Sequence, residues 1–116
     1  MSIRKLVRKT TVTVTEQEDA QSFILEYYVL ERETFVDGIS ANTYGVEVLK
    51  RSNPDSKVLK VEYRKIFDIF CTEAEAYEAA WILAENTVTP VSVCDIIEQF
   101  IGTDEFEWEE YEVAAI

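Results

Sequence analysis

The sequence predicts an α+β fold, in which an antiparallel β-meander of about four strands packs on a C-terminal helical hairpin. Three observations lead to this fold class. The first half is rich in β-branched residues that partly alternate with polar ones. Turn signals at Asp37–Gly38 and in SNPDS (52–56) divide that half into strands. In the second half, apolar residues recur at three- and four-residue spacing, which is typical of amphipathic helices.

The first two strands are predicted on either side of a polar break. KLVRKTTVTVT (5–15) has the composition of a half-buried strand, and EQEDAQ (16–21) is expected to be a hairpin loop. SFILEYYVLERETF (22–35) carries apolar residues on both faces. A strand of that kind is expected in the centre of a sheet, with something packed on each side for part of its length.

Two further strands follow the Asp37–Gly38 turn. NTYGVEVLKR (42–51) alternates Tyr44, Val46 and Val48 with the residues between them. KVLKVEYRKIFDIFC (57–71) changes the phase of its alternation near Lys65. A phase change of this kind predicts a bend or a β-bulge.

The first helix is predicted to begin at a capping box and to end near Glu85 or Asn86. In Thr72-Glu73-Ala74-Glu75 the threonine hydroxyl is expected to accept from the Glu75 N–H, while the glutamate reaches back. One face is apolar, Trp81 lies at its edge, and Ile82 falls nearer the glutamates; that face contains Ala76, Tyr77, Ala80, Leu83 and Ala84.

The second helix is predicted to start at Thr89 as N-cap and Pro90 as first residue. Its apolar stripe ends at Gly102 and contains Val93, Ile96, Ile97, Phe100 and Ile101. Cys94 belongs to that stripe, with acids nearby and no base within reach in the sequence. A reactive thiol needs an electropositive neighbourhood, so we expect Cys94, and likewise Cys71, to be packed structural residues.

Length and composition indicate one domain over residues 1–103, followed by an acidic-aromatic extension at 104–116. The chain has 116 residues, 47% of them hydrophobic, and no histidine. Histidine is the commonest general base and transition-metal ligand. Two cysteines are too few for a disulfide framework, and no apolar run has the roughly 18–20 residues of a membrane span. We therefore expect a cytoplasmic, non-enzymatic protein with no cofactor, no metal and no membrane contact.

The charge is strongly negative and unevenly distributed. The net charge is −12, with four basic residues and no acid in residues 1–15, and twelve acids and no base in residues 72–116. Because neutralising phosphates requires clustered Lys and Arg, direct nucleic-acid binding is not expected. The opposite ends can attract each other within one molecule or between copies. The charge also permits a role as an acidic decoy for a nucleic-acid-binding protein.

The candidate interaction surface comprises the aromatic residues of the tail together with one helical residue: Phe106, Trp108, Tyr111 and Ile82. One interpretation of the tail is an edge strand or a segment packed on its own domain or on a second copy. Another is an acidic-aromatic motif that docks into a groove on a partner. The favoured function is a protein-interaction or regulatory module whose partner is another protein or itself, so that a homodimer is possible.

The alternative function is small-ligand binding, or weak catalysis, in a pocket between sheet and helices. Tyr28, Tyr44 and Asp68 are its candidate residues, because Asp68 is the one acid inside a strongly apolar run, IFDIF. A raised pKa of that carboxyl would favour this alternative. The simpler interpretation of Asp68 is an outward strand residue or a turn cap. The chain has only three glycines and no glycine-rich phosphate loop.

Four segments resemble a small family of uncharacterised proteins from Gram-positive anaerobes. The segments are EYYVLERE (26–33), TYGVEVLKR (43–51), IFDIFCTEAEAYEAAWIL (66–83) and NTVTPVSVCDIIEQFIG (86–102). The resemblance covers about residues 20–102 and lies in the order of paired tyrosines, a Tyr-Gly strand, a capped helix and a helix that starts at Pro. It implies a shared fold and assigns no functional residue.

Overall fold

The computed structural model describes residues 2–16, 19–52, 59–101 and 107–115. Their elements are β1 (Ser2–Glu16), β2 (Asp19–Val36), β3 (Ile39–Ser52), β4 (Leu59–Phe70), α1 (Glu73–Glu85), a 3-10 turn η1 (Pro90–Ser92), α2 (Val93–Ile101) and β5 (Glu107–Ala115). The fold is α+β, as the sequence predicts. Among the described residues, no helix combines the length and the apolar character needed to cross a membrane.

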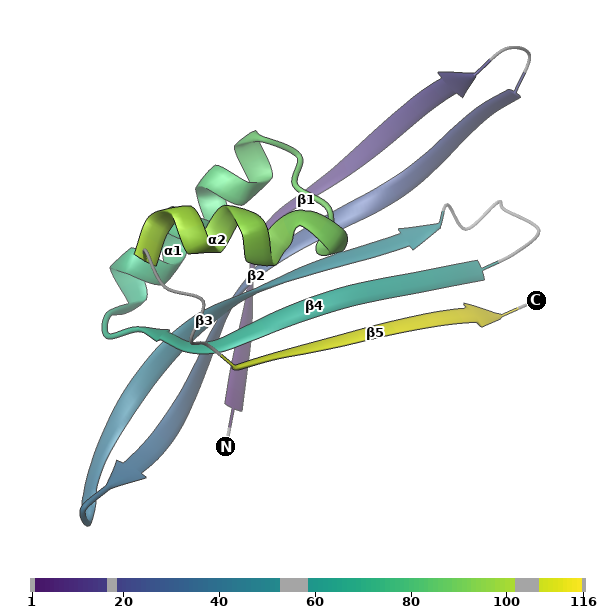
Figure 1. The fold of residues 1–116 in the computed structure, drawn as a ribbon. Helices are drawn as coiled ribbons and strands as arrows, with labels where there is room; N and C mark the ends of the chain where they lie inside the picture. The colour runs from purple at the N-terminus through teal and green to yellow at the C-terminus, as the bar shows by residue number, and fades with distance from the viewer. Residues whose placement is uncertain (1, 17–18, 53–58, 102–106, 116) are drawn as a thin grey trace.

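The sheet is a sequential antiparallel meander in the order β1-β2-β3-β4-β5 (Figure 1). The four expected strands are present, and the tail adds a fifth, β5, which pairs with β4. β1 and β5 are therefore the two edges of the described sheet. The hairpin ends of β1–β2 and β2–β3 project beyond the helices at opposite ends of the molecule (Figure 1).

The turn between β2 and β3 forms where the Asp37–Gly38 pair predicts it. Both residues have positive φ, 52° at Asp37 and 78° at Gly38, which the two-residue hairpin turn matching the twist of the strands requires. The expected loop at 16–21 is shorter than predicted, since β1 continues to Glu16 and β2 begins at Asp19. The predicted turn at 52–56 falls largely outside the described residues.

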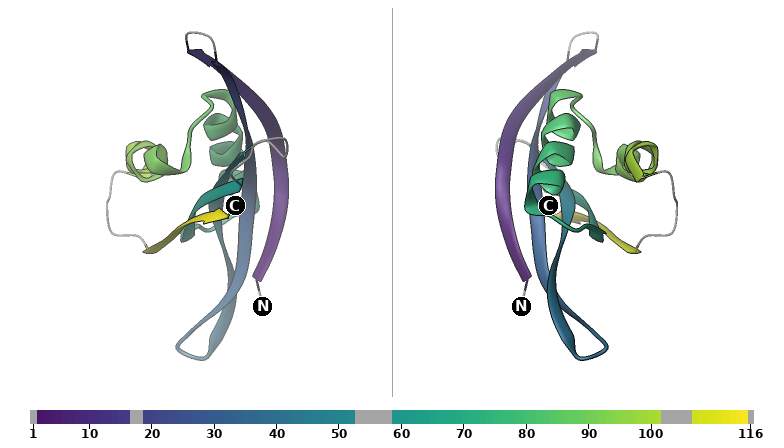
Figure 2. Two further views of the ribbon diagram at one scale, coloured as in Figure 1. Left: turned by 90° about the vertical axis from the view of Figure 1, so that its right-hand side faces the viewer. Right: turned by 90° about the vertical axis from the view of Figure 1, so that its left-hand side faces the viewer.

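Both helices lie on one face of the curved sheet (Figure 2). α1 packs mainly on β2 and β3 and reaches β1, while η1 contacts β3 and β4. The core between the layers consists of buried side chains from three strands and both helices, among them Leu25, Tyr27, Val29, Val46, Val48, Ile66, Ala76, Ala80, Leu83, Val93 and Ile97. We call this the covered face of the sheet, and the opposite side the open face.

Tyr27 joins the two layers by packing and by one hydrogen bond. Its ring is completely buried, and its hydroxyl donates to the backbone carbonyl of Val88 at 2.9 Å. Val88 lies between the helices, so this bond fixes the α1–α2 connection to the middle of the sheet. Burial raises the pKa of Tyr27 to about 12.

The shifted pKa of Tyr27 predicts loss of stability at alkaline pH. The unfolded tyrosine ionises near its ordinary pKa of 10, and the folded one only near 12. This contribution is fully present below pH 10 and is lost as the pH rises to 12, by about 2–3 kcal/mol. Chemical denaturation across pH 8–12 should show a steeper decline for the wild-type protein than for Tyr27→Phe. Parallel curves for the two proteins would contradict the assignment to Tyr27.

Helix α1 begins and ends where the sequence predicts. The Thr72 hydroxyl accepts from the Glu75 N–H at 3.2 Å and donates to the Glu75 carboxylate at 2.8 Å, so the glutamate returns to the hydroxyl instead of the cap N–H. The buried face is made mostly of alanines. Tyr77 was expected on it, but it is 51% exposed, because it lies on the flank that faces β1.

Removing the cap of α1 should cost a measurable amount of stability. Thr72→Ala leaves the Glu75 N–H without its acceptor and should lower the free energy of unfolding by about 0.5–2 kcal/mol. Thr72→Ser keeps the hydroxyl and should stay close to wild type. Urea denaturation of both variants measures the difference, and equal losses in the two would mean that the methyl group, not the cap, matters.

The start of the second helix differs from the prediction. Pro90 opens a 3-10 turn, and Thr89 at its N-cap position makes no side-chain capping bond; α2 begins only at Val93. Cys94 is half-buried against the core, in line with a packing role, and forms no disulfide with the other described cysteine. Cys71 was expected to be packed, but it is exposed, because it follows the end of β4 before α1 begins.

Two β-bulges interrupt the register of the strands as far as the structure describes them. Between β3 and β4 the register passes from Val46↔Ile66 to Tyr44↔Phe70, so Phe67, Asp68 and Ile69 lie opposite Gly45 alone. The predicted irregularity near Lys65 therefore lies a few residues further on. The second bulge lies in β1, between Leu6 and Arg8.

Candidate functional site

The three residues of the expected pocket lie on opposite faces of the sheet. Tyr44 packs against the core on the covered face. Tyr28 belongs to the open face, because its neighbours Tyr27 and Val29 are core residues and successive strand residues alternate. Asp68 also points to the open face, where it meets Arg32 and Thr43. The sheet itself therefore separates Tyr44 from the other two.

Asp68 is held ionised in the β4 bulge. Its φ of 57° is unusual for a residue with a side chain. The Arg32 Nε donates to both carboxylate oxygens, at 2.9 and 3.0 Å, and the Thr43 hydroxyl donates to one of them. The hydrogen bond from Arg32 is the main reason that the pKa of Asp68 is lowered. A general acid needs a raised pKa, so the lowered pKa of Asp68 does not suit that role. Its hydrogen bonds to Arg32 and Thr43 instead attach the bulge to β2 and β3.

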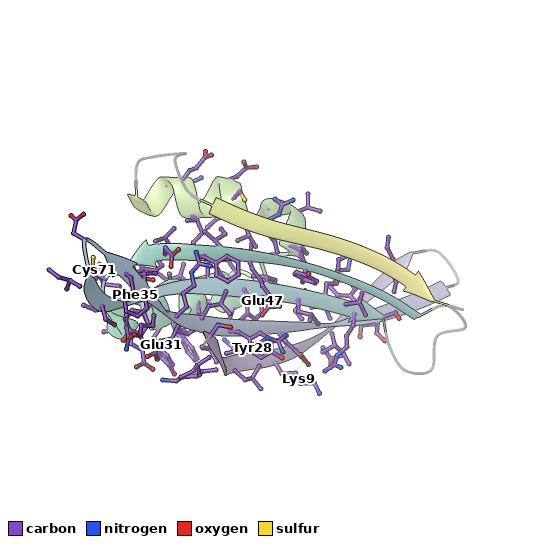
Figure 3. All side chains as sticks on the ribbon, turned by 90° about the horizontal axis from the view of Figure 1, so that it is seen from below. Lys9, Tyr28, Glu31, Phe35, Glu47 and Cys71 are labelled. Carbon is purple, nitrogen blue, oxygen red and sulfur yellow. The ribbon has the colours of Figure 1, made fainter. Side chains whose placement is uncertain are left out.

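The open face carries a network in which an arginine at each end pairs with a glutamate and a neutral tyrosine lies between the two glutamates. We call it the ionic ladder, and its members are Arg4, Glu47, Tyr28, Glu26 and Arg51 (Figure 3 labels Tyr28 and Glu47). Arg4 binds both oxygens of the Glu47 carboxylate, at 2.6 and 3.3 Å, and its guanidinium lies 3.6 Å from the centre of the Tyr28 ring. The Tyr28 hydroxyl donates to Glu26 at 2.6 Å. Glu26 also pairs with Arg51.

The ladder explains how two carboxylates are buried on a face without helices. Glu47 is 2% exposed and Glu26 is also buried. Each accepts from a guanidinium, and long Arg and Tyr side chains cover both, so their desolvation is compensated. Desolvation and the bond to Glu26 raise the pKa of Tyr28 to about 12. The ladder thus links β1, β2 and β3 and is a structural network.

The free edge of β1 is flanked by exposed aromatic residues of α1. Tyr77 and Trp81 are 51% and 43% exposed and stand one helical turn apart on the flank of α1 that faces β1. The guanidinium carbon of Arg8 lies 5.1 Å from the centre of the Trp81 ring, and Nη1 of Arg8 pairs with the Glu85 carboxylate at 2.6 Å. Ile3 and Leu6 of β1 are exposed as well.

The outer half of β1 lacks the features that protect sheet edges. Edge strands are commonly shielded by Lys, Pro, bulges or short length. Thr10–Thr15 contains only threonine and valine, and the bulge and the basic residues lie before it. Thr11 and Thr13 are exposed. We call this strand edge with Tyr77 and Trp81 the β1 edge surface.

The residues expected in the interaction surface are spread over two elements. Ile82 is half-buried on α1, and Phe106 lies outside the described residues. Trp108 and Tyr111 belong to β5, whose backbone places them opposite Ile66 and Tyr63 of β4. This backbone pairing agrees with the interpretation of the tail as an edge strand held against its own domain.

The sequence contains a signal for the β1 edge surface. The uncharged run TTVTVT and the spacing of Tyr77 and Trp81 are both visible in it. Neither the edge position of this run nor the nearness of α1 follows from local pattern, because both depend on strand order and on how α1 lies on the sheet.

A family of unknown function, DUF6514, matches residues 6–103. No curated protein and no solved structure matches the chain.

Proposed function

The chain belongs to the family of unknown function DUF6514, and we propose that it is a non-enzymatic protein-interaction module that binds an extended protein segment along the β1 edge surface. A segment that adds to a sheet edge gains main-chain hydrogen bonds from the strand and specificity from side chains beside it. The observation that carries the proposal is the unprotected run Thr10–Thr15 together with exposed Tyr77 and Trp81.

The electrostatics of the described site favour binding over catalysis. Arg32 lowers the pKa of Asp68, and the sheet separates Asp68 from Tyr44, which removes the support that a ligand pocket would draw from these residues. The carboxylates of the ionic ladder are occupied by guanidinium groups. Two cysteines that form no disulfide in the described structure, together with the acidic composition, support a place in the cytoplasm, where thiols stay reduced.

A pair of substitutions on the β1 edge tests this function. Thr11→Lys with Thr13→Lys places two charges of the protective kind on the edge while changing only exposed side chains. Ser40→Lys with Asn42→Lys is the matched control, since it adds the same charges to exposed positions of β3. Tagged proteins are incubated in extract of the native cells, and bound proteins are identified by mass spectrometry, with the solution mass of each protein measured alongside.

We expect wild type and control to retain a protein, another copy of the chain included, that the edge variant loses. Trp81→Ala should weaken the same association, because the ring borders the edge. Retention of the same proteins by all four forms, with the same solution mass, would place any interaction elsewhere and overturn the proposal. Circular dichroism and thermal melting confirm that each variant is folded.

A further inference from the structure

The outer half of β1 is complementary to itself when read in opposite directions. Arg8–Glu16 begins with a base, ends with an acid and has Val12 at its centre. Antiparallel pairing about Val12 sets Arg8 opposite Glu16, Lys9 opposite Thr15 and Thr11 opposite Thr13. Cross-strand pairs of opposite charge and pairs of threonines both stabilise antiparallel strands.

We propose that the occupant of the β1 edge surface is a second copy of this chain, paired through Arg8–Glu16 about a two-fold axis at Val12. The inference rests on the proposed function and names its partner. A two-fold interface uses the same patch on both copies, which is why a self-complementary strand suits it. Two five-stranded sheets would become one continuous sheet.

The alternation of side chains is consistent with this register. Residues opposite each other in an antiparallel pair lie on the same face. Beyond the bulge, Arg8, Thr10 and Val12 pair in register with Tyr27, Leu25 and Phe23, which face or pack against the core. Pairing Arg8 with Glu16 and Val12 with itself keeps positions of equal parity together, so the helices of both copies lie on one side.

The same register brings the aromatic flank of α1 into the interface. Arg8 lies below the Trp81 ring. The partner strand would run beside Arg8 at the usual strand spacing of about 4.8 Å. The outward side of Trp81, which is exposed in the single chain, would then border the end of the partner strand. Aromatic residues in such positions supply most of the energy of many interfaces.

Charge argues against the other edge pairings. A two-fold axis nearer the N-terminus would set the basic residues Arg4, Lys5, Arg8 and Lys9 against each other and would cross the bulge. β5, the opposite edge, has the sequence EWEEYEVAA, so two copies of it would repel. Pairing β1 with β5 of another copy is favourable in charge, but it joins two different edges. Each added copy would then leave another unpaired edge, so the assembly would not close as a dimer does.

A charge-swap experiment tests the partner and the register together. Thr11→Lys/Thr13→Lys sets lysine opposite lysine twice in the proposed pair, and Thr11→Glu/Thr13→Glu sets glutamate opposite glutamate. We expect wild type and the Ser40→Lys/Asn42→Lys control to have twice the 13.4 kDa chain mass by sedimentation, and each β1 variant to be a monomer. Mixing the two β1 variants should restore a 1:1 dimer, whose affinity should fall as salt is raised.

The outcomes separate this inference from the proposed function. A wild-type dimer that persists in both β1 variants, or variants that fail to pair when mixed, would overturn the inference. A monomeric wild type overturns it too, and the function still stands if a captured protein is lost in the β1 variants. Larger open assemblies that dissolve when β5 is deleted would indicate β1–β5 pairing and would also contradict the two-fold dimer. A wild-type dimer that is lost in each β1 variant and restored when the two variants are mixed supports both the inference and the proposed function.

Discussion

Replacing Gly45 by alanine is expected to lower the free energy of unfolding by about 4 kcal/mol or more, a loss seen only when a specific packing feature is destroyed. A Cβ at this position would lie 1.9 Å from the carbonyl oxygen of Ile66 and 2.9 Å from its carbonyl carbon. Those atoms belong to the backbone of β4, which cannot rotate aside. The β4 bulge creates the contact, because three residues of β4 face Gly45 alone.

Gly38→Ala is the control for Gly45→Ala, since it makes the same chemical change at a site with open space. Gly38 has a φ of 78°, and no atom of the described residues lies within 4 Å of the place that a Cβ would take, so alanine there meets only backbone strain. We expect a loss of about 1–2 kcal/mol. Denaturant unfolding of both proteins measures the difference. Equal losses would show that β4 can shift to make room, and that the bulge is softer than its geometry indicates.

Removing Arg4 is expected to destabilise the protein by about 2–3 kcal/mol. Arg4→Ala leaves the Glu47 carboxylate, which is 2% exposed, without the guanidinium that holds both its oxygens. Breaking a fully buried ion pair costs about 3–5 kcal/mol, and the partial exposure of Arg4 lets water return part of that loss. Arg4 also covers the Tyr28 ring, so some packing is lost with the charge.

A double substitution separates the pair from its parts. Arg4→Met with Glu47→Leu removes both charges and keeps the apolar volume, so its stability should return close to that of wild type. Lys5→Ala breaks an exposed pair with Glu73 and should change little. Thermal melts and urea titrations of the wild type and the three variants measure these differences. An Arg4→Ala protein as stable as Lys5→Ala would mean that Glu47 finds another partner or reaches water.

The fold class follows from local pattern because each element has its own signal. Asp37–Gly38 accepts the positive φ of its turn, and Thr72 with Glu75 caps α1, and both features depend only on neighbours in sequence. β5 was only one of two interpretations of the tail, since its alternation of aromatic and acidic residues fits a strand as well as a docking motif. Its pairing is decided by the free edge of β4, which is distant in sequence.

The candidate site was less predictable, because it depends on relations between elements. Asp68 stands in an apolar run, which suggests burial and a raised pKa, but the bulge turns it towards Arg32 on β2. Glu26 and Glu47 have the pattern of solvent-facing strand residues, yet long side chains of other strands cover them. Tyr77 has the helical position of a core residue and is exposed, because α1 meets the sheet mainly through its alanines.

The position of β5 has a consequence for how the chain is made. Each of β2, β3 and β4 can pair with the strand before it as soon as it leaves the ribosome, because the sheet order is the order of synthesis. β4 is different, since its second neighbour follows only after both helices. At about 5–20 residues per second, the stretch from Phe70 to Glu107 takes about 2–7 s to translate. During those seconds the nascent protein exposes a bare β4 edge, so crowded polysomes are where neighbouring chains of this protein are most apt to pair wrongly.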